Sequence, residues 1–150
     1  MDKFNTIELP ESILSRNVKQ GNLEFVKFLI EDCKYPTEWL NHSDVMSVVV
    51  NGYVDMFKFL LEKGIDHILS LDDGWFFVWA ASHNELDLAK LLVECGANYT
   101  TRYDTALHRA IDYNHQEMLS YIQSLNVDRN KVKQHENIRL YYNAATTCSD

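Results

Sequence analysis

The chain has few of the residues that define several protein classes. Five glycines and two prolines among 150 residues exclude collagen-like and low-complexity architectures. Basic residues are also scarce, because 14 Lys and Arg stand against 22 Asp and Glu and leave a net charge of −8. An acidic chain repels phosphate backbones and anionic membrane surfaces. We therefore expect neither nucleic acid nor a membrane as a partner.

Long apolar runs and paired cysteines are lacking as well. The run from Trp75 to Ala81 is among the longest, and a helix that crosses a bilayer needs about 20 apolar residues. The residues after Met1 show no charged-then-apolar signal segment, so we expect no secretory route. Cys33, Cys95 and Cys148 are widely spaced and form no CxxC pair. This pattern predicts free thiols, no metal site and an intracellular, cytoplasmic protein.

The chain does contain an internal repeat of about 31 residues. The segment from Gly21 to Glu31 (GNLEFVKFLIE) returns as Gly52 to Glu62 (GYVDMFKFLLE) and as Asn84 to Glu94 (NELDLAKLLVE), and a weaker copy runs from Asn114 to Ile122. The acidic residues at positions 24, 55, 87 and 117 recur at intervals of 31, 32 and 30. Chance does not readily align an acid, a lysine and a paired apolar block three times.

Each copy has the spacing of a helix with one apolar face. In the second copy, Val54, Phe57 and Leu60 fall at i, i+3 and i+6. We expect Leu60 and Leu91 to be buried between neighbouring repeats. A left-handed residue commonly ends a helix, and the sequence offers these residues at that place: Gly64, Gly96, Cys33 and Asn126.

A shorter apolar segment precedes each copy. The four segments are Ser12 to Val18, Ser43 to Val50, Trp75 to Ala81 and Thr105 to Ile111. A side-chain oxygen favours a helix N-terminus, so we expect caps from Ser12, Ser43, Thr105 and either Asp72 or Asp73. Each repeat is then a helix, a tight turn, a second helix and a loop of about ten residues, too short for a domain linker.

These motifs resemble the ankyrin-repeat family. Thr105 to Ala110 (TALHRA) resembles the T-P-L-H-x-A signature, with Ala106 in place of proline. The sequence Gly-Ala-Asn at positions 96–98 resembles the Gly-Ala-Asp that closes a helix pair, and the second-helix copies resemble G-x-x-[DE]-x-[VA]-[KR]-x-L-[LI]. The resemblance covers about residues 10 to 126. Phrases such as VDMFKFLLEKG among Asn- and Tyr-rich segments are similar to ankyrin proteins of giant DNA viruses of amoebae, the mimivirus-like group.

The resemblance implies an all-α fold, an ankyrin-type solenoid in a single domain of residues 1–150. Its four helix-turn-helix repeats would span about 10–33, 43–64, 75–96 and 105–126. A C-terminal capping helix would follow at about 136–147, because a repeat array needs its last face covered. Asn84 and Asn114 replace the turn glycine, and asparagine tolerates the left-handed conformation, so both turns should form.

The resemblance also implies a non-catalytic protein–protein interaction module. In the family pattern, residues just before each inter-helix turn and each first helix line a concave face, alongside inter-repeat loops. The candidates for partner binding are Trp75, His83, Tyr113, His42, Asn51, Gln20 and Asp104. Trp75, His83 and Tyr113 form a candidate hot spot, because aromatic residues are enriched in such clusters. Trp75 could instead pack under its own loop, while the pattern leaves Trp79 undecided between core and surface.

Three other functions stay open alongside partner binding. The chain could be a self-associating structural module, a cellular signalling adaptor or inhibitor, or an enzyme. The sequence contains no phosphate loop, nucleophile elbow or metal motif, so we expect no catalysis and no cofactor. His108 lies in the signature, where the family uses it structurally. A viral protein would meet host proteins in the host cytoplasm, and the acidic charge favours a partner with basic patches.

Overall fold

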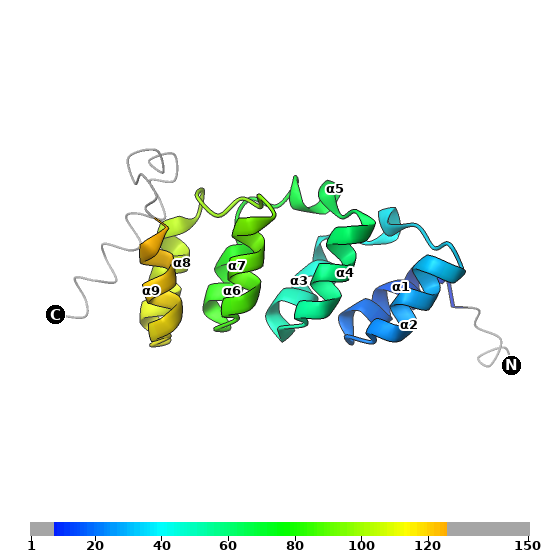
Figure 1. The fold of residues 1–150 in the computed structure, drawn as a ribbon, viewed down its shortest axis with the longest axis horizontal. Coiled ribbons are helices and arrows are strands. Elements are labelled where there is room, and N and C mark those ends of the chain that lie inside the picture. The colour runs from blue at the N-terminus through cyan, green and yellow to red at the C-terminus, as the bar shows by residue number, and fades with distance from the viewer. Residues whose placement is uncertain (1–7, 126–150) are drawn as a thin grey trace, which may run out of the picture. The chain divides into compact units, whose positions relative to one another are not determined.

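The computed structural model describes residues 8–125, and their regular secondary structure is entirely helical (Figure 1). Helix pairs follow one another along this range: α1 (Pro10–Lys19) with α2 (Leu23–Lys27) and its continuation η2 (Phe28–Asp32), α3 (His42–Asn51) with α4 (Val54–Lys63), α6 (Trp75–Ser82) with α7 (Leu86–Glu94), and α8 (Tyr103–Asp112) with α9 (Gln116–Ser124). The short helices η3 (Thr37–Trp39) and α5 (Asp66–Leu69) lie in the connections. The all-α prediction is confirmed. The capping helix expected at 136–147 lies outside the described residues, as does Asn126.

The chain divides into two compact units. Unit 1 extends to Ile68 and unit 2 begins at Leu69. Within unit 1, α1 packs on α3, and each of these first helices packs on the second helix of its own repeat. Within unit 2, α6 packs on α8 in the same way, with α7 and α9 as their second helices. In each unit, neighbouring repeats therefore stack through their first helices.

The turns inside the helix pairs adopt the left-handed backbone that the sequence predicts. Gly21 and Gly52 have φ values of 75° and 71°. Asn84 and Asn114 take the same place in unit 2, with φ values of 55° and 56°. The replacement of glycine by asparagine therefore leaves the turn unchanged, because asparagine is among the few residues that tolerate this conformation.

The left-handed residue that ends the first helix pair is not Cys33. Cys33 has a right-handed backbone with φ of −83°, and Lys34 adopts the left-handed conformation with φ of 61°. The reason is the π-helical segment η2, in which the Cys33 amide donates to the carbonyl of Phe28, five residues back. A π turn holds one more residue than an α turn, so the end of this helix moves one position along the chain.

Three of the predicted helix caps are wrong. Ser12, Ser43 and Thr105 all lie inside helices, and none is the N-cap. At α3 the cap is Asn41, whose side chain accepts from the Asp44 amide while the Asp44 carboxylate accepts from the Asn41 amide. This reciprocal pair satisfies two donors at once, which one serine hydroxyl could not do.

The N-cap residue of α6 is Gly74, and Asp72, one of the two predicted aspartates, supplies a side-chain acceptor from two residues before it. A carboxylate oxygen of Asp72 accepts from the Phe76 amide at 3.2 Å, and Asp72 itself is buried. Phe76 and Phe77 behind it are buried too, at 0 % and 1 % exposure, so these two aromatic residues belong to the core. The aspartate therefore holds the start of a helix whose first turn is apolar.

Both helices of each repeat contribute buried apolar residues to the core. Leu60 has no exposed surface, as expected. Leu91 is only partly buried, whereas its neighbour Leu92 has no exposed surface. The prediction for Leu91 was therefore wrong by one position. Counting from the turn residue explains this, because Leu60 is eight residues after Gly52 and Leu92 is eight residues after Asn84.

Candidate protein-binding surface

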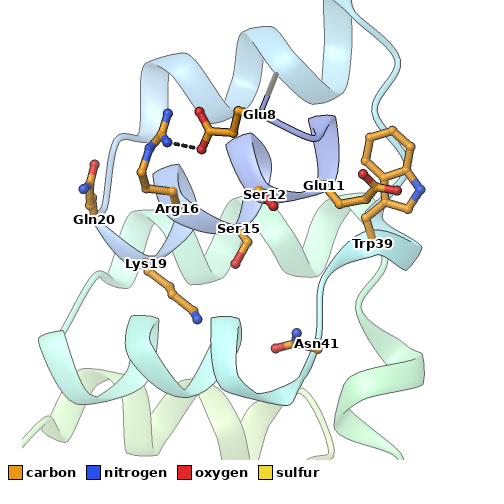
Figure 2. A pocket seen from close by; sticks show the side chains of 9 residues that line it. All are labelled: Glu8, Glu11, Ser12, Ser15, Arg16, Lys19, Gln20, Trp39 and Asn41. Atoms are coloured by element: carbon orange, nitrogen blue, oxygen red, sulfur yellow. Dashed lines mark hydrogen bonds and ion pairs between the residues drawn. The ribbon is translucent and has the colours of Figure 1, made fainter. Parts of the chain in front are cut away.

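A polar groove opens beside α1 in unit 1 (Figure 2). Its volume is about 630 Å³, and these residues line it: Glu8, Glu11, Ser12, Ser15, Arg16, Lys19, Gln20, Trp39 and Asn41. Arg16 forms an ion pair with Glu8, and the Lys19 ammonium lies 3.7 Å from a carboxylate oxygen of the fully buried Asp44. Both cations that line the groove, Arg16 and Lys19, are therefore already paired with carboxylates of the same chain. Trp39 adds an aromatic side chain to the lining.

The unit 1 candidates lie at the ends of first helices. Gln20 is the exposed C-cap of α1 and lines the groove. Asn51 is the exposed last residue of α3, and its amide donates to the Ser47 carbonyl at 2.7 Å. His42 is the half-buried first residue of α3. Gln20 and Asn51 therefore share the position before a turn, whereas His42 lies at the opposite end of its helix.

In unit 2, the C-terminal end of α6 presents a tryptophan and a histidine side by side. The ring centres of Trp79 and His83 are 5.6 Å apart, because the two residues are one helical turn apart. Trp79 is 38 % exposed and His83 is exposed, which places Trp79 at the surface. Nδ1 of His83 lies 3.0 Å from the Trp79 carbonyl. A carbonyl only accepts, so Nδ1 donates in this contact and Nε2 remains on the other side of the ring.

The next repeat also places an aromatic ring beside an imidazole, here a tyrosine. Tyr113, the C-cap of α8, is 53 % exposed, and its ring centre lies 5.9 Å from that of His115. Nδ1 of His115 lies 3.0 Å from the Ala81 carbonyl in the preceding repeat. This bond ties the two repeats together at the level of their turns. We call Trp79, His83, Tyr113 and His115 the aromatic–imidazole ridge.

Sequence reasoning did not identify His115 as part of this surface. The bond from His115 joins residues that are 34 positions apart, and no local pattern signals it. Trp79 was undecided because its helical position is half exposed throughout the repeat pattern. His83 and Tyr113 were identified, because they directly precede Asn84 and Asn114 at the turns.

Trp75 lies one helical turn before Trp79 on α6 and has partners within its own unit. It is half-buried at the start of α6, and the Arg102 guanidinium carbon lies 4.1 Å from its ring centre. Arg102 in turn donates at 2.8 Å to both the carbonyl and the carboxylate of Asp73. One face of the indole is therefore covered by a cation that links two successive loops.

The other two residues singled out by the sequence lie on α8. Asp104 is half-buried in its first turn. His108 is half-buried further along, and its Nε2 lies 3.1 Å from a carboxylate oxygen of Asp112. Neither is as exposed as Tyr113 at the end of the same helix.

Titratable clusters of the kind that bind metal ions do not occur within residues 8–125. Cys33 and Cys95 are exposed and are not joined by a disulfide. No helix in the described part of the chain is both long and apolar enough to span a bilayer.

Comparison with known proteins agrees with the helix pairs and their turns. A family model described as ankyrin repeats in three copies matches residues 45–134, more than half of the chain. The chain belongs to the ankyrin-repeat family. Ankyrin repeats are generally protein–protein interaction modules, and proteins built from them are typically not enzymes.

One curated relative is an ankyrin repeat protein of Acanthamoeba polyphaga mimivirus. It is 36 % identical over 75 residues, which is 47 % of this chain and 10 % of the relative. The chain therefore spans about a tenth of the length of that protein. No solved structure matches the chain significantly.

Proposed function

We propose that this ankyrin-repeat chain is a viral protein-recognition module that binds a host protein through the ends of its first helices and the adjoining loops. The observation that carries the proposal is the aromatic–imidazole ridge of unit 2. It places two aromatic rings and two imidazoles on neighbouring repeats, with Trp79, His83 and Tyr113 exposed. Large aromatic side chains lose little conformational entropy on binding and dominate interface hot spots.

A rigid surface supports this role. The Trp79 carbonyl fixes the His83 ring and the Ala81 carbonyl fixes the His115 ring, so both imidazoles are oriented before a partner arrives. Binding to an oriented surface loses less entropy than binding to a mobile one. The net charge of −8 favours a partner with a basic surface, through faster encounter.

Unit 1 offers candidate residues of its own. Gln20 and Asn51 are exposed at the matching pre-turn positions, and the groove beside α1 offers polar groups together with Trp39. Trp75 and Asp104 stay in the candidate set with His42, as residues at or near the start of first helices. The mimivirus relative supports the viral setting, and an amoebal host would then supply the partner in its cytoplasm.

Quantitative affinity capture from an amoebal lysate tests the proposal. Wild-type chain, Tyr113→Ala, His83→Ala and a matched control, Phe25→Ala, serve as baits, and bound proteins are compared by mass spectrometry. Phe25 is an aromatic residue that is 44 % exposed on the second helix α2. A protein retained by the wild type and the control but lost with both ridge variants supports the ridge as the anchor. Equal capture by all four baits contradicts it.

Trp75→Ala separates anchoring from loop packing. If Trp75 binds the partner, the substitution weakens capture and leaves the urea midpoint near that of the wild type. If its contact with Arg102 is structural, the midpoint falls and the affinity of the folded protein is unchanged. Measuring both quantities on this one variant decides which role the indole has.

A further inference from the structure

The groove beside α1 contains one carboxylate that pairs with no cation of the described chain. Arg16 pairs with Glu8, and the Lys19 ammonium lies 3.7 Å from the buried Asp44 carboxylate. Glu11 also lines the groove and is exposed, but no cation within residues 8–125 forms an ion pair with it. The two cations of the groove are therefore committed to other acids, and Glu11 is open to a cation from outside the chain.

The indole of Trp39 lines the same groove as Glu11. Helix α1 packs on η3 within unit 1, and Figure 2 shows the Glu11 side chain extending from α1 towards the Trp39 ring. Tyr35 packs against the indole, with ring centres 5.2 Å apart and planes inclined by 56°. The Trp39 amide also donates to the Pro36 carbonyl at 3.2 Å. These contacts orient the indole before a ligand arrives, which lowers the entropy lost on binding.

A guanidinium of the chain itself occupies a similar pair of groups in unit 2. The Arg102 guanidinium carbon lies 4.1 Å from the centre of the Trp75 ring, and Nη2 of Arg102 donates to the Asp73 carboxylate at 2.8 Å. A planar guanidinium can stack on an indole and donate to a carboxylate at the same time. Trp39 and Glu11 offer the same two groups, an aromatic face and a carboxylate, and no cation of the described chain lies over Trp39.

The charges of the groove favour a cation over an anion. Because Arg16 is paired with Glu8 and Lys19 with Asp44, the carboxylate of Glu11 is the charge left without a counterion in the lining. An anionic side chain would have to displace Glu8 or Asp44 before it could pair with a cation here. Arginine suits the groove better than lysine, because an ammonium is a compact point charge that cannot stack on a ring.

We infer that this groove binds an arginine side chain of the partner protein, with its guanidinium over Trp39 and paired with Glu11. The inference rests on the proposed recognition role and adds to it the chemistry of one partner residue. The groove volume of about 630 Å³ accommodates such a side chain. One exposed ion pair contributes little free energy, so this contact selects among partners more than it adds to affinity.

A single-residue ligand tests the groove without any partner protein. N-acetyl-arginine N-methylamide is titrated into the isotope-labelled chain, and NMR follows the indole Nε1–H signal of Trp39, which Trp39→Phe assigns. The signal should shift to saturation. The citrulline analogue has nearly the same shape without the charge, and should bind about fivefold more weakly, the upper end for one exposed ion pair. The lysine analogue should also bind more weakly than the arginine compound, and equal binding would contradict the assignment of a guanidinium.

Glu11→Gln and Glu38→Gln separate a local contact from general electrostatics. Each variant removes one negative charge from an exposed glutamate of unit 1, but Glu38 lies on η3 outside the lining of the groove. Glu11→Gln should weaken binding of the arginine compound by about three- to fivefold. Glu38→Gln should leave its Kd unchanged, and both variants should keep the far-UV helix signal of the wild type.

Three results overturn the inference: no saturable shift at Trp39, equal binding of the citrulline analogue, or equal losses in the two glutamine variants. These titrations contain no partner protein, so their outcome is independent of the capture experiment. Arginine binding at the groove, together with equal capture by all ridge variants, would contradict the ridge and support the groove. Ridge-dependent capture without arginine binding would do the reverse.

Discussion

The aromatic ring of Tyr53 lies directly against the backbone of Gly21. A methyl carbon added at Gly21 would meet Cζ of Tyr53 at 2.7 Å, which is closer than any real contact allows. The turn of the first repeat and the turn of the second are therefore in contact, through a glycine on one side and a ring on the other. Two separate constraints act at Gly21, its positive φ and this close approach.

Gly21→Ala should destabilise the protein more than Gly96→Ala. Gly96 also has a positive φ, of 82°, but no atom lies within 4 Å of an added methyl carbon. Gly96→Ala should therefore cost only the backbone term, roughly 1–2 kcal/mol, and the excess at Gly21 reports the Tyr53 contact. Urea unfolding measures both free energies. Equal losses would show that Tyr53 moves aside freely.

Leu92→Ala should lower the free energy of unfolding by about 2–5 kcal/mol, the usual cost of a cavity at a fully buried leucine. Leu91→Ala should lower it less, because Leu91 is only partly buried while Leu92 has no exposed surface. The Leu→Ala change alters helix propensity equally at these two adjacent positions of α7, so the two variants differ mainly in the burial of the side chain that is removed. A larger loss at Leu91 in thermal or urea unfolding would contradict the observed register.

The buried carboxylate of Asp44 should couple the first two repeats. It accepts from the Ser15 hydroxyl, 29 residues earlier, and from the Asn41 amide at 2.9 Å. Asp44→Ala removes this acceptor from a half-buried donor, Ser15, and an exposed one, Asn41, so we expect a loss of roughly 0.5–1.5 kcal/mol per hydrogen bond. Ser15→Ala should cost less. In a double-mutant cycle the two losses should not add, and additive losses would mean that the bond contributes nothing.

Tyr121 should make the protein sensitive to alkaline pH. Burial raises the pKa of its phenol above 10.0, and the charges of Glu94 and Tyr99 raise it further. The unfolded chain then loses this proton first, so the stabilisation is complete below about pH 10 and is lost as pH rises through the folded pKa. Urea midpoints measured between pH 9 and 11 should fall less steeply for Tyr121→Phe than for the wild type. Parallel curves would exclude this contribution.

Local chemistry determined much of the fold. The spacing of apolar residues indicated the helix pairs, since one face of a helix repeats every three to four positions. The turns were predictable because a left-handed backbone favours glycine and asparagine, and Gly52 and Asn84 both occur just before a second helix. The in-phase acids and lysines were sufficient for the ankyrin resemblance, and His83 and Tyr113 followed from their places before the turns.

Tertiary contacts decided the rest. Asn41 caps α3 because the Asp44 carboxylate accepts from the Asn41 amide in return. The same carboxylate also accepts from Ser15 of another repeat. The π-helical turn at η2 moved the left-handed residue from Cys33 to Lys34, a change of one residue that no periodic pattern encodes. The bond from His115 to the Ala81 carbonyl depends on two backbones brought within 3.0 Å after 34 residues of chain. Distances of that kind are set by how the repeats stack, so sequence spacing alone indicated the helices and turns but not which residues touch.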